Sequence, residues 1–366
     1  MSRSRRIYDS FLFDGELDLL EFRLRQNYDE TDFFVLVEAG ETYRGHPKPF
    51  TFAEHRDRFA WAAAKLRPIQ LKALGNPSSS PKQRALVQRN AIVLALSEAA
   101  PEDILLVADA DEIPSLSALR WLRDQGIGEP HRLEMTRHYQ RINLLAPAST
   151  CCIDRAQPFA FAAPRFRLSG WDSLSSRWSG RSAVATPIGF FRDHPGESPY
   201  SVRFSGVTRP VLKDAGRHLT ATDPSAMLAR KLGRVFHAEW ATDRGMYPPH
   251  LALCEEHGVH HRGWWYAEQV PGALPEDLEH FAAACPVALR SSPLPPMMSR
   301  RMVRTWAWMR QWAALPDGLV RFIDDRFQRM TPLLFVPLWL ADLARAVAGK
   351  FWKRKEAVAL EGHAHH

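Results

Sequence analysis

The fold of this chain is decided by the stretch ILLVADADEIP, residues 104–114. A short apolar run ends abruptly at Asp109, and a second carboxylate, Asp111, follows one residue later. Such a run is typical of a buried strand in an α/β sheet. The two carboxylates then lie at the carboxyl end of that strand, where open α/β sheets bind their ligands. Two acidic groups this close repel each other unless water solvates them or a divalent cation bridges them.

Carboxylate oxygens suit Mg²⁺ or Mn²⁺, and substrate phosphates normally complete the coordination of such an ion. The motif therefore predicts a protein that handles a nucleotide diphosphate. A second interpretation stays open, because an Asp-x-Asp after a strand is often only a solvated turn. Ser115 would then cap a helix that carries Leu116, Leu119 and Leu122 on one face.

Strands and helices alternate over the first 125 residues of the chain. Apolar runs predict strands over residues 7–13, 32–38 and 67–71, in addition to the one that ends at Asp109. Leucines at helical spacing predict a helix over 16–28, and a second helix over 82–99 carries Gln88, Arg89 and Asn90. We therefore predict an α/β fold, with a mostly parallel sheet flanked by helices.

The chain changes character twice after residue 125. Residues 126–290 are irregular and rich in aromatics, Pro, Gly, Ser and Arg, with a helix expected over 224–236, which suits a loop-rich half that binds a second substrate. Residues 297–355 follow a Pro-rich boundary and read as an amphipathic helical appendage, and 356–366 read as a tail. Tryptophans beside Lys and Arg in the appendage suit an anionic membrane surface. The alternative is that its apolar faces pack on the main domain or on a second subunit.

Composition narrows the class of protein. The 366 residues are 45% hydrophobic and 24% charged, as in a soluble globular protein, and suffice for one large domain or two. A net charge of +7 favours phosphate-bearing partners, but the Arg residues are scattered and match no nucleic-acid recognition motif. Four cysteines predict no disulfide framework. With a poor signal peptide and no apolar run of about twenty residues, we expect a cytoplasmic protein, peripheral at most on the inner face of the membrane.

The first 120 residues contain an ordered set of motifs that resembles glycosyltransferase family 17. The set comprises IYDSFLF at 7–13 with ELDLLE at 16–21, FVLVEA at 34–39, Thr42 with Gly45 and PKP at 47–49, QRNAI at 88–92, and DADEIP at 109–114. The second half resembles the family more loosely, in Trp178-x-Gly180-Arg181, in Gly216-Arg217-His218 and in the segment from Phe236 to Glu239. Arg217 stands where the family pattern has Trp, which leaves the acceptor open, and no resemblance extends beyond about residue 285.

This resemblance implies a GT-A-like domain over residues 1–290, with a nucleotide-sugar-binding half at 1–125 and an acceptor-binding half at 126–290. It also implies a nucleotide-sugar donor such as a UDP-sugar, Mn²⁺ or Mg²⁺ as cofactor, and transfer with inversion to a saccharide acceptor. The eukaryotic member of the family uses UDP-GlcNAc, so GlcNAc is a candidate sugar. A cell-envelope glycan or a lipid-linked sugar is a candidate acceptor.

The resemblance also suggests roles for individual residues. Asp109 and Asp111 would bind the metal ion, with His218 as the third ligand and His237 as its alternative. A carboxylate in the second half would deprotonate the acceptor hydroxyl, and the candidates are Glu239, Asp172 and Asp193. The expected donor-binding residues are Asp9, Glu38, Arg89, Asn90, Asp109, Trp178 and Arg181.

Each role has a structural alternative. Arg89 could simply pair with Glu38 or Asp109, Glu112 could be a helix-entry carboxylate, orient a ligand or form a salt bridge nearby, and Glu239 could form a salt bridge. Trp171 and Trp178 could stack on sugars or belong to the core. Cys254, His257, His260 and His261 superficially offer zinc ligands, although no second Cys pair accompanies them. A sugar- or nucleotide-binding module with the same fold but no turnover is the alternative to an enzyme.

Overall fold

The computed structural model describes residues 4–146, 177–178, 183–204, 209–220, 247–260, 266–270, 272–285, 290–312 and 316–327. Its strands are β1 (Ile7–Phe13), β2 (Phe33–Ala39), β3 (Leu66–Leu71), β4 (Ile104–Asp109), β5 (Glu112–Pro114), β6 (His131–Tyr139), β7 (Arg141–Leu145), β8 (Arg177–Trp178), β9 (Val184–Pro187), β10 (Val211–Thr220) and β11 (Glu268–Gln269). Its α-helices are α1 (Leu17–Asn27), α2 (Thr51–Glu54), α3 (Pro81–Asn90), α4 (Leu116–Gln125), α5 (Gly189–Asp193), α6 (Pro199–Phe204), α8 (Pro248–Glu256), α9 (Glu276–Ala284) and α10 (Met297–Trp312).

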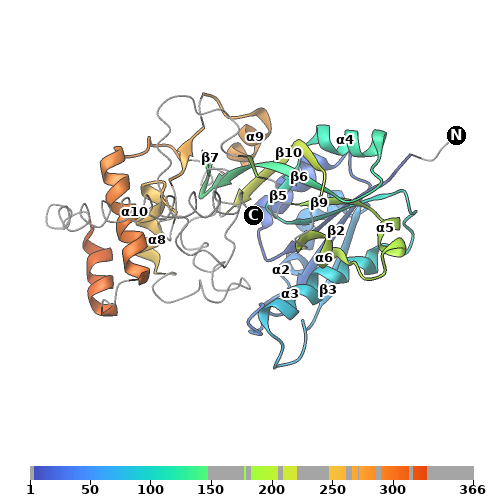
Figure 1. The fold of residues 1–366 in the computed structure, drawn as a ribbon, viewed down its shortest axis with the longest axis horizontal. Coiled ribbons are helices and arrows are strands. Elements are labelled where there is room, and N and C mark those ends of the chain that lie inside the picture. The colour runs from blue at the N-terminus through green and yellow to red at the C-terminus, as the bar shows by residue number, and fades with distance from the viewer. Residues whose placement is uncertain are drawn as a thin grey trace, which may run out of the picture.

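One sheet runs through the molecule with the strand order β11-β7-β6-β9-β4-β1-β2-β3 (Figure 1). Strands β3, β2, β1 and β4 pair in parallel, as the first half of the sequence predicts. The second half of the sheet is mixed, because β9 runs antiparallel to β4 and β6 while β10 runs parallel to β6 and antiparallel to β5. The predicted α/β class, with helices flanking the sheet, is confirmed, but the sheet is mixed and not mostly parallel, because the strands after β4 pair chiefly antiparallel.

Helices cover both faces of the parallel strands, which explains why these strands are almost continuously apolar. Alternate residues of β4 point to opposite faces, so Leu106 packs with α1 and α4, whereas Leu105 and Val107 pack toward the α6 side. The same alternation places Asp109, the last residue of β4, on the α6 side of the sheet. This position decides which side chains it meets.

The predicted elements match the observed ones closely in the first half of the chain, with one exception. The strands end at Phe13, Ala39, Leu71 and Asp109, and Ser115 accepts from the Ala118 N–H at the start of α4, as the capping pattern predicts. The helix expected over 82–99 instead ends at Asn90 and continues as a 3₁₀ turn over Ala91–Ala95. The apolar run there has no polar face, and only Ile92 within that turn is fully buried.

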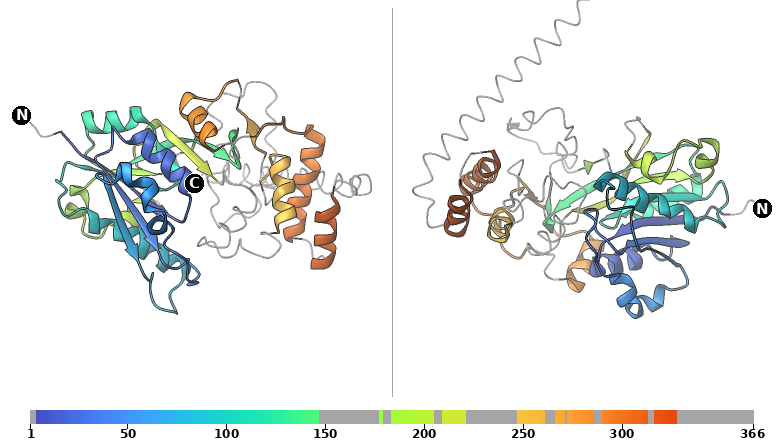
Figure 2. Two further views of the ribbon diagram at one scale, coloured as in Figure 1. Left: turned by 180° about the vertical axis from the view of Figure 1, so that it is seen from behind. Right: turned by 90° about the horizontal axis from the view of Figure 1, so that it is seen from below.

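Helices α8 and α10, with residues 317–327, form a second cluster at the end of the molecule opposite α5 (Figures 1 and 2). The face of α10 with Met302, Val303 and Trp306 packs against α8 and against the buried side chains within residues 317–327, so apolar faces of the predicted appendage bury each other. The predicted zinc site does not assemble in the described part of the chain, because His257 bonds the Leu253 carbonyl and Ser299. In the same part, no helix is long and apolar enough to cross a bilayer.

Candidate functional site

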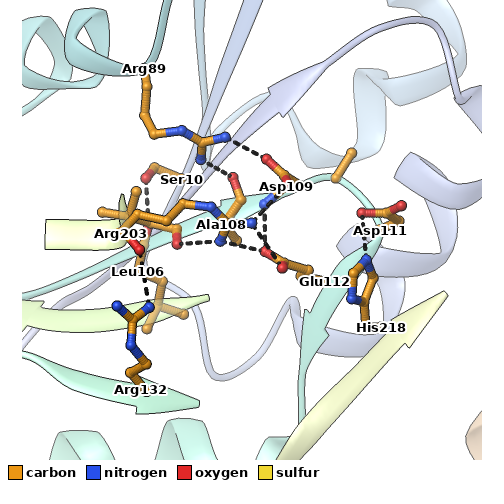
Figure 3. Close-up of polar contacts among 12 residues, drawn as sticks. Ser10, Arg89, Leu106, Ala108, Asp109, Asp111, Glu112, Arg132, Arg203 and His218 are labelled. Carbon is orange, nitrogen blue, oxygen red and sulfur yellow. Dashed lines mark hydrogen bonds and ion pairs between the residues drawn. The ribbon is translucent and has the colours of Figure 1, made fainter. Parts of the chain in front are cut away.

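Asp109 is held by two arginines at the carboxyl end of β4 (Figure 3). Arg89 of α3 donates from Nη2 to Oδ1 at 2.5 Å, and Arg203 of α6 donates from Nη2 to Oδ2 at 2.7 Å. Burial alone would raise the pKa of Asp109, but the charges of Arg203 and Arg89 outweigh it and hold that pKa well below its ordinary value. Asp109 is therefore an anion engaged on both oxygens.

A buried carboxylate supports Arg203 from behind. Glu112 has no exposed surface and accepts from Arg203 Nη1 at 2.7 Å and Nη2 at 2.9 Å. It also accepts from the Asp109 backbone N–H at 2.9 Å, which closes the turn between β4 and β5. The open role of Glu112 is thereby resolved, since it orients both Arg203 and the turn that carries the aspartates.

Asp9 shapes the same turn through Arg23. These two side chains are fully buried, and Arg23 donates to Asp9 with two nitrogens, at 2.5 and 2.8 Å. The remaining nitrogen of Arg23 donates to the carbonyls of Asp109, Ala110 and Glu112 at 3.0, 3.2 and 2.8 Å. Asp9 lies beneath the turn, so its structural role is to hold Arg23 rather than to face the site.

Three consecutive residues of α3 connect three different elements at this site. Gln88 donates to the Val37 carbonyl of β2 at 3.0 Å. Arg89 donates to the Ala108 carbonyl at 3.0 Å as well as to Asp109. Asn90 accepts from the Tyr200 N–H at 3.0 Å and so anchors the helix that carries Arg203. The QRN motif thus connects α3 to β2, β4 and α6 at the site.

Asp111 meets His218 because β5 turns back antiparallel to β10. His218 pairs with Glu112 in that ladder, and the Leu219 N–H donates to the Asp111 carbonyl at 2.7 Å. Gly216 makes this approach possible, since its φ is +150° and a Cβ there would lie 2.2 Å from the Ile113 carbonyl oxygen. As a result, His218 Nε2 lies 3.6 Å from Asp111 Oδ1, although 106 residues separate the two in the sequence (Figure 3).

This arrangement can be tested for its fit to a divalent cation. Burial lowers the pKa of His218 despite the neighbouring Asp111, so the imidazole is neutral and able to ligate. Two ligands that each lie about 2.1 Å from one ion are about 3–4 Å apart, which agrees with the observed separation. Asp109 is engaged by arginines, and within the described ranges no three His, Cys, Asp or Glu side chains gather closely enough to hold a metal. Asp111 and His218 therefore fit as two ligands, with other groups completing the shell.

Other predicted residues lie elsewhere. Glu38 is fully buried and accepts from the Phe52 N–H at 3.0 Å, which ties β2 to α2. Burial raises the pKa of Glu38. Asp193 is exposed beside Arg192, on a helix whose Gly189 N–H bonds the Pro101 carbonyl at 2.8 Å. Because Pro101 and Asp103 precede β4, the helix that carries Asp193 begins at the amino end of that strand, whereas Asp109 lies at its carboxyl end.

Several further predictions lie outside the described residues. These are Asp172, Glu239, His237, Arg181, Trp171, His261 and the helix over 224–236, and of Trp178 the structure describes only the backbone, in β8. Arg217, the departure from the family pattern, forms an ion pair with Asp277 of α9, with Nε 2.6 Å from Oδ2. A positively charged residue there thus joins β10 to α9.

Two residues of the site were not predicted. Arg203 follows an irregular segment that has no recognisable motif, so only the fold brings it to Asp109. Tyr43 lies in the loop after β2, where burial raises the pKa of its hydroxyl and the charges of Arg89 and Asp109 act on it in opposite directions. Tyr43 thus borders the same polar cluster.

The comparisons agree with the predicted resemblance. The sequence model of glycosyltransferase family 17 matches residues 1–146, the region that supplies Asp9, Arg89, Asp109 and Asp111. The β-1,4-mannosyl-glycoprotein 4-β-N-acetylglucosaminyltransferases of Rattus norvegicus and Homo sapiens are 25% and 24% identical over 167 residues. These alignments cover 42% of this chain and 31% of each relative, so the chain spans about a third of the curated relatives it matches.

A solved structure also aligns with this chain. The inositol-1-phosphate CTP transferase from T. maritima is 12% identical, with a TM-score of 0.31, over 58% of this chain and 87% of that one.

Proposed function

We propose that this protein is a glycosyltransferase that moves a sugar from a nucleotide-sugar donor to a saccharide acceptor, with GlcNAc a candidate sugar and a UDP-sugar the expected donor. One observation carries the proposal: the Asp109–Glu112 turn, in the segment that matches family 17, lies with two arginines and His218 at the carboxyl end of β4. That edge is where an α/β sheet binds a nucleotide.

The charge of the site supports a requirement for a divalent cation. Arg89 and Arg203 bind Asp109 and Glu112, whereas Asp111 has His218 as its neighbour. A diphosphate beside Asp111 would meet repulsion from that carboxylate, which Mn²⁺ or Mg²⁺ would offset. Asp111 and His218 would hold the ion, and when bound it would stabilise charge on the departing diphosphate as a Lewis acid.

The other residues of the site would orient the reaction. Glu112 and Arg23 fix the turn, so that Asp111 keeps its position opposite His218. The arginines supply planar donors for phosphate oxygens. Of the base candidates, Glu239 and Asp172 stay proposals for deprotonating the acceptor, and Asp193 is the least favoured because its helix begins at the amino end of β4.

The test uses the purified full chain, a panel of UDP-sugars and Mn²⁺. We expect hydrolysis or transfer with at least one donor, and binding of UDP that requires the cation. Asp111→Asn should lower both at least about a hundredfold, the size of effect seen when a group that acts in catalysis is removed. The matched control is Asp57→Asn, which removes an exposed carboxylate from another part of the molecule. Equal activity of Asp111→Asn and the wild type would refute the assignment.

A binding module without turnover is the second candidate. The observation in its favour is that both carboxylate oxygens of Asp109 are already bonded to arginines. UDP-sugar binding in the micromolar range, with neither transfer nor hydrolysis over the whole panel, would favour this function over the first.

Contact with an anionic membrane surface is a separate part of the proposal. Since the faces with Trp306 and Phe327 are buried together, the contact would involve the exposed side chains of Met297, Met298, Leu319 and Phe322. Flotation with anionic liposomes should fall when Leu319 and Phe322 are both changed to Ser. Unchanged flotation would remove the membrane from the proposal.

A further inference from the structure

Arg89 and Arg203 are almost completely buried, yet the carboxylate between them is not. The exposed fractions of the three side chains are 5% for Arg89, 3% for Arg203 and 41% for Asp109. The two guanidinium groups therefore face solvent mainly through the place that the Asp109 carboxylate occupies. A ligand that reached them from solvent would have to take that place.

Both arginines would keep their positions without Asp109. Arg203 is fixed by two hydrogen bonds to Glu112, and Arg89 is fixed by its bond to the Ala108 carbonyl. The ring of Phe204 lies 5.4 Å from the Arg89 guanidinium and 5.5 Å from that of Arg203, so it packs against both. The Nη2 groups that now donate to Asp109 would point at the same space, where Arg89 Nη2 would have lost its bond to Asp109 and Arg203 Nη2 would keep its bond to Glu112.

The acceptor that best suits two such groups is a phosphate. Arginine donors are planar and match the spacing of oxygens on a carboxylate or a phosphate, and a phosphate offers more oxygens and more charge than a carboxylate. From the fold, this place lies at the carboxyl end of β4, beside Asp111 and His218. A diphosphate could therefore contact the two arginines and a cation on Asp111 together.

We propose that Arg89 and Arg203 form an arginine clamp for the donor diphosphate, and that Asp109 occupies this clamp until the diphosphate displaces it. This inference rests on the proposed function, because it names the groups that recognise the donor. It assigns Arg203 as a donor-binding residue. It also gives Asp109 two successive partners. Without donor, Asp109 binds the two arginines; with donor bound, it would face the cation that holds the diphosphate.

Binding of UDP tests the clamp without any catalytic measurement. Isothermal titration of the full chain with UDP in EDTA should give tighter binding to Asp109→Asn than to the wild type, by about tenfold or more, because an internal competing charge is removed. Arg203→Gln should weaken UDP binding at least about tenfold with Mn²⁺ present, and Arg203→Lys should weaken it less, since the charge remains. The control is Arg192→Ala, which removes an exposed arginine. Its helix begins at the amino end of β4, so UDP affinity should be unchanged.

The outcomes separate this inference from the proposed function. If Asp109→Asn binds UDP in EDTA no better than the wild type, or if Arg203→Gln binds it equally well while remaining folded, the clamp is refuted even if the enzyme transfers sugar. If the predicted affinities are found but no sugar is transferred, the clamp stands and the glycosyltransferase assignment fails. A second variant, Arg89→Gln, covers the case in which Arg203→Gln does not fold.

Discussion

Two carboxylates in this molecule bind arginine, and they have opposite surroundings. Asp109 binds Arg89 and Arg203 at the carboxyl end of β4 and is partly exposed. Asp324 lies in the C-terminal helical cluster with no exposed side-chain surface, where Arg310 donates to it at 2.6 Å and Trp306 Nε1 at 2.7 Å. Two arginines hold the pKa of Asp109 well below its ordinary value, whereas burial outweighs one arginine and raises the pKa of Asp324.

The difference shows which of the two carboxylates serves binding and which serves the fold. Asp324 ties α10 to residues 317–327, and its side chain has no exposed surface. Asp109 is paired with two arginines, and its side chain is partly exposed to solvent. A ligand can therefore compete with Asp109 for these arginines. An ion pair that a ligand can reach is a candidate for function, and one that is sealed is a candidate for stability.

The largest expected effect is on the sealed pair. Asp324→Ala leaves the Arg310 charge buried and without its carboxylate, which should lower the free energy of unfolding by about 3–5 kcal/mol. Asp109→Ala should lower it by less than about 1–2 kcal/mol, because Arg203 keeps Glu112. Urea unfolding followed by circular dichroism measures both. Asp325→Ala, which removes the neighbouring exposed carboxylate and its hydrogen bond from the Tyr247 hydroxyl, is the control and should cost less than Asp324→Ala. Equal losses of unfolding free energy in Asp324→Ala and Asp109→Ala would contradict the distinction between a buried structural ion pair and an exposed functional one.

A smaller effect is expected where the site depends on backbone contact. In Gly216→Ala the new Cβ would lie 2.2 Å from the Ile113 carbonyl oxygen and 2.8 Å from the Pro114 Cα, so β10 must move away from β5. We expect a loss of about 1–3 kcal/mol in unfolding free energy and a larger relative loss of cation-dependent UDP binding, because His218 moves from Asp111. Gly128→Ala, where a Cβ meets nothing within 4 Å, should be neutral. A neutral Gly216→Ala would mean that the β5–β10 contact does not position His218.

The smallest effect is in the pH dependence of stability. The contributions of Asp324 and Asp109 to the free energy of unfolding should change in opposite directions as pH falls. The pKa of Asp324 is raised on folding, so its contribution is largest below the unfolded value of about 3.9 and is lost as pH rises through the folded value. The pKa of Asp109 is depressed, so its contribution is present above about 3.9 and is lost only in stronger acid.

The measurement is urea unfolding between pH 7 and pH 4 for the wild type, Asp324→Asn and Asp109→Asn. As pH falls over this range, the wild type should gain stability relative to Asp324→Asn. Its difference from Asp109→Asn should stay level and shrink only below that range. Parallel curves for the wild type and Asp324→Asn would contradict the assignment of a raised pKa to Asp324.

Much of the first half of the molecule follows from local pattern. The strand that ends at Asp109, the Ser115 cap and the placement of Arg89 near the aspartates could be predicted, because strand alternation and capping act within a few residues. Arg89 pairs with Asp109 and not with Glu38, and its role toward a donor stays a prediction. The extent of the 82–99 helix was wrong, since a uniformly apolar run does not reveal where a helix stops.

The sequence alone determined that an acidic motif ends a buried strand of an α/β sheet, in a segment similar to family 17, because these features are written in adjacent residues. Only the tertiary structure decided that Arg203 and His218 join that motif and that Asp193 does not. Those three residues lie between 84 and 109 positions along the chain from Asp109. Their distance in space depends on how β9, β10 and α6 return to β4, which no local spacing encodes.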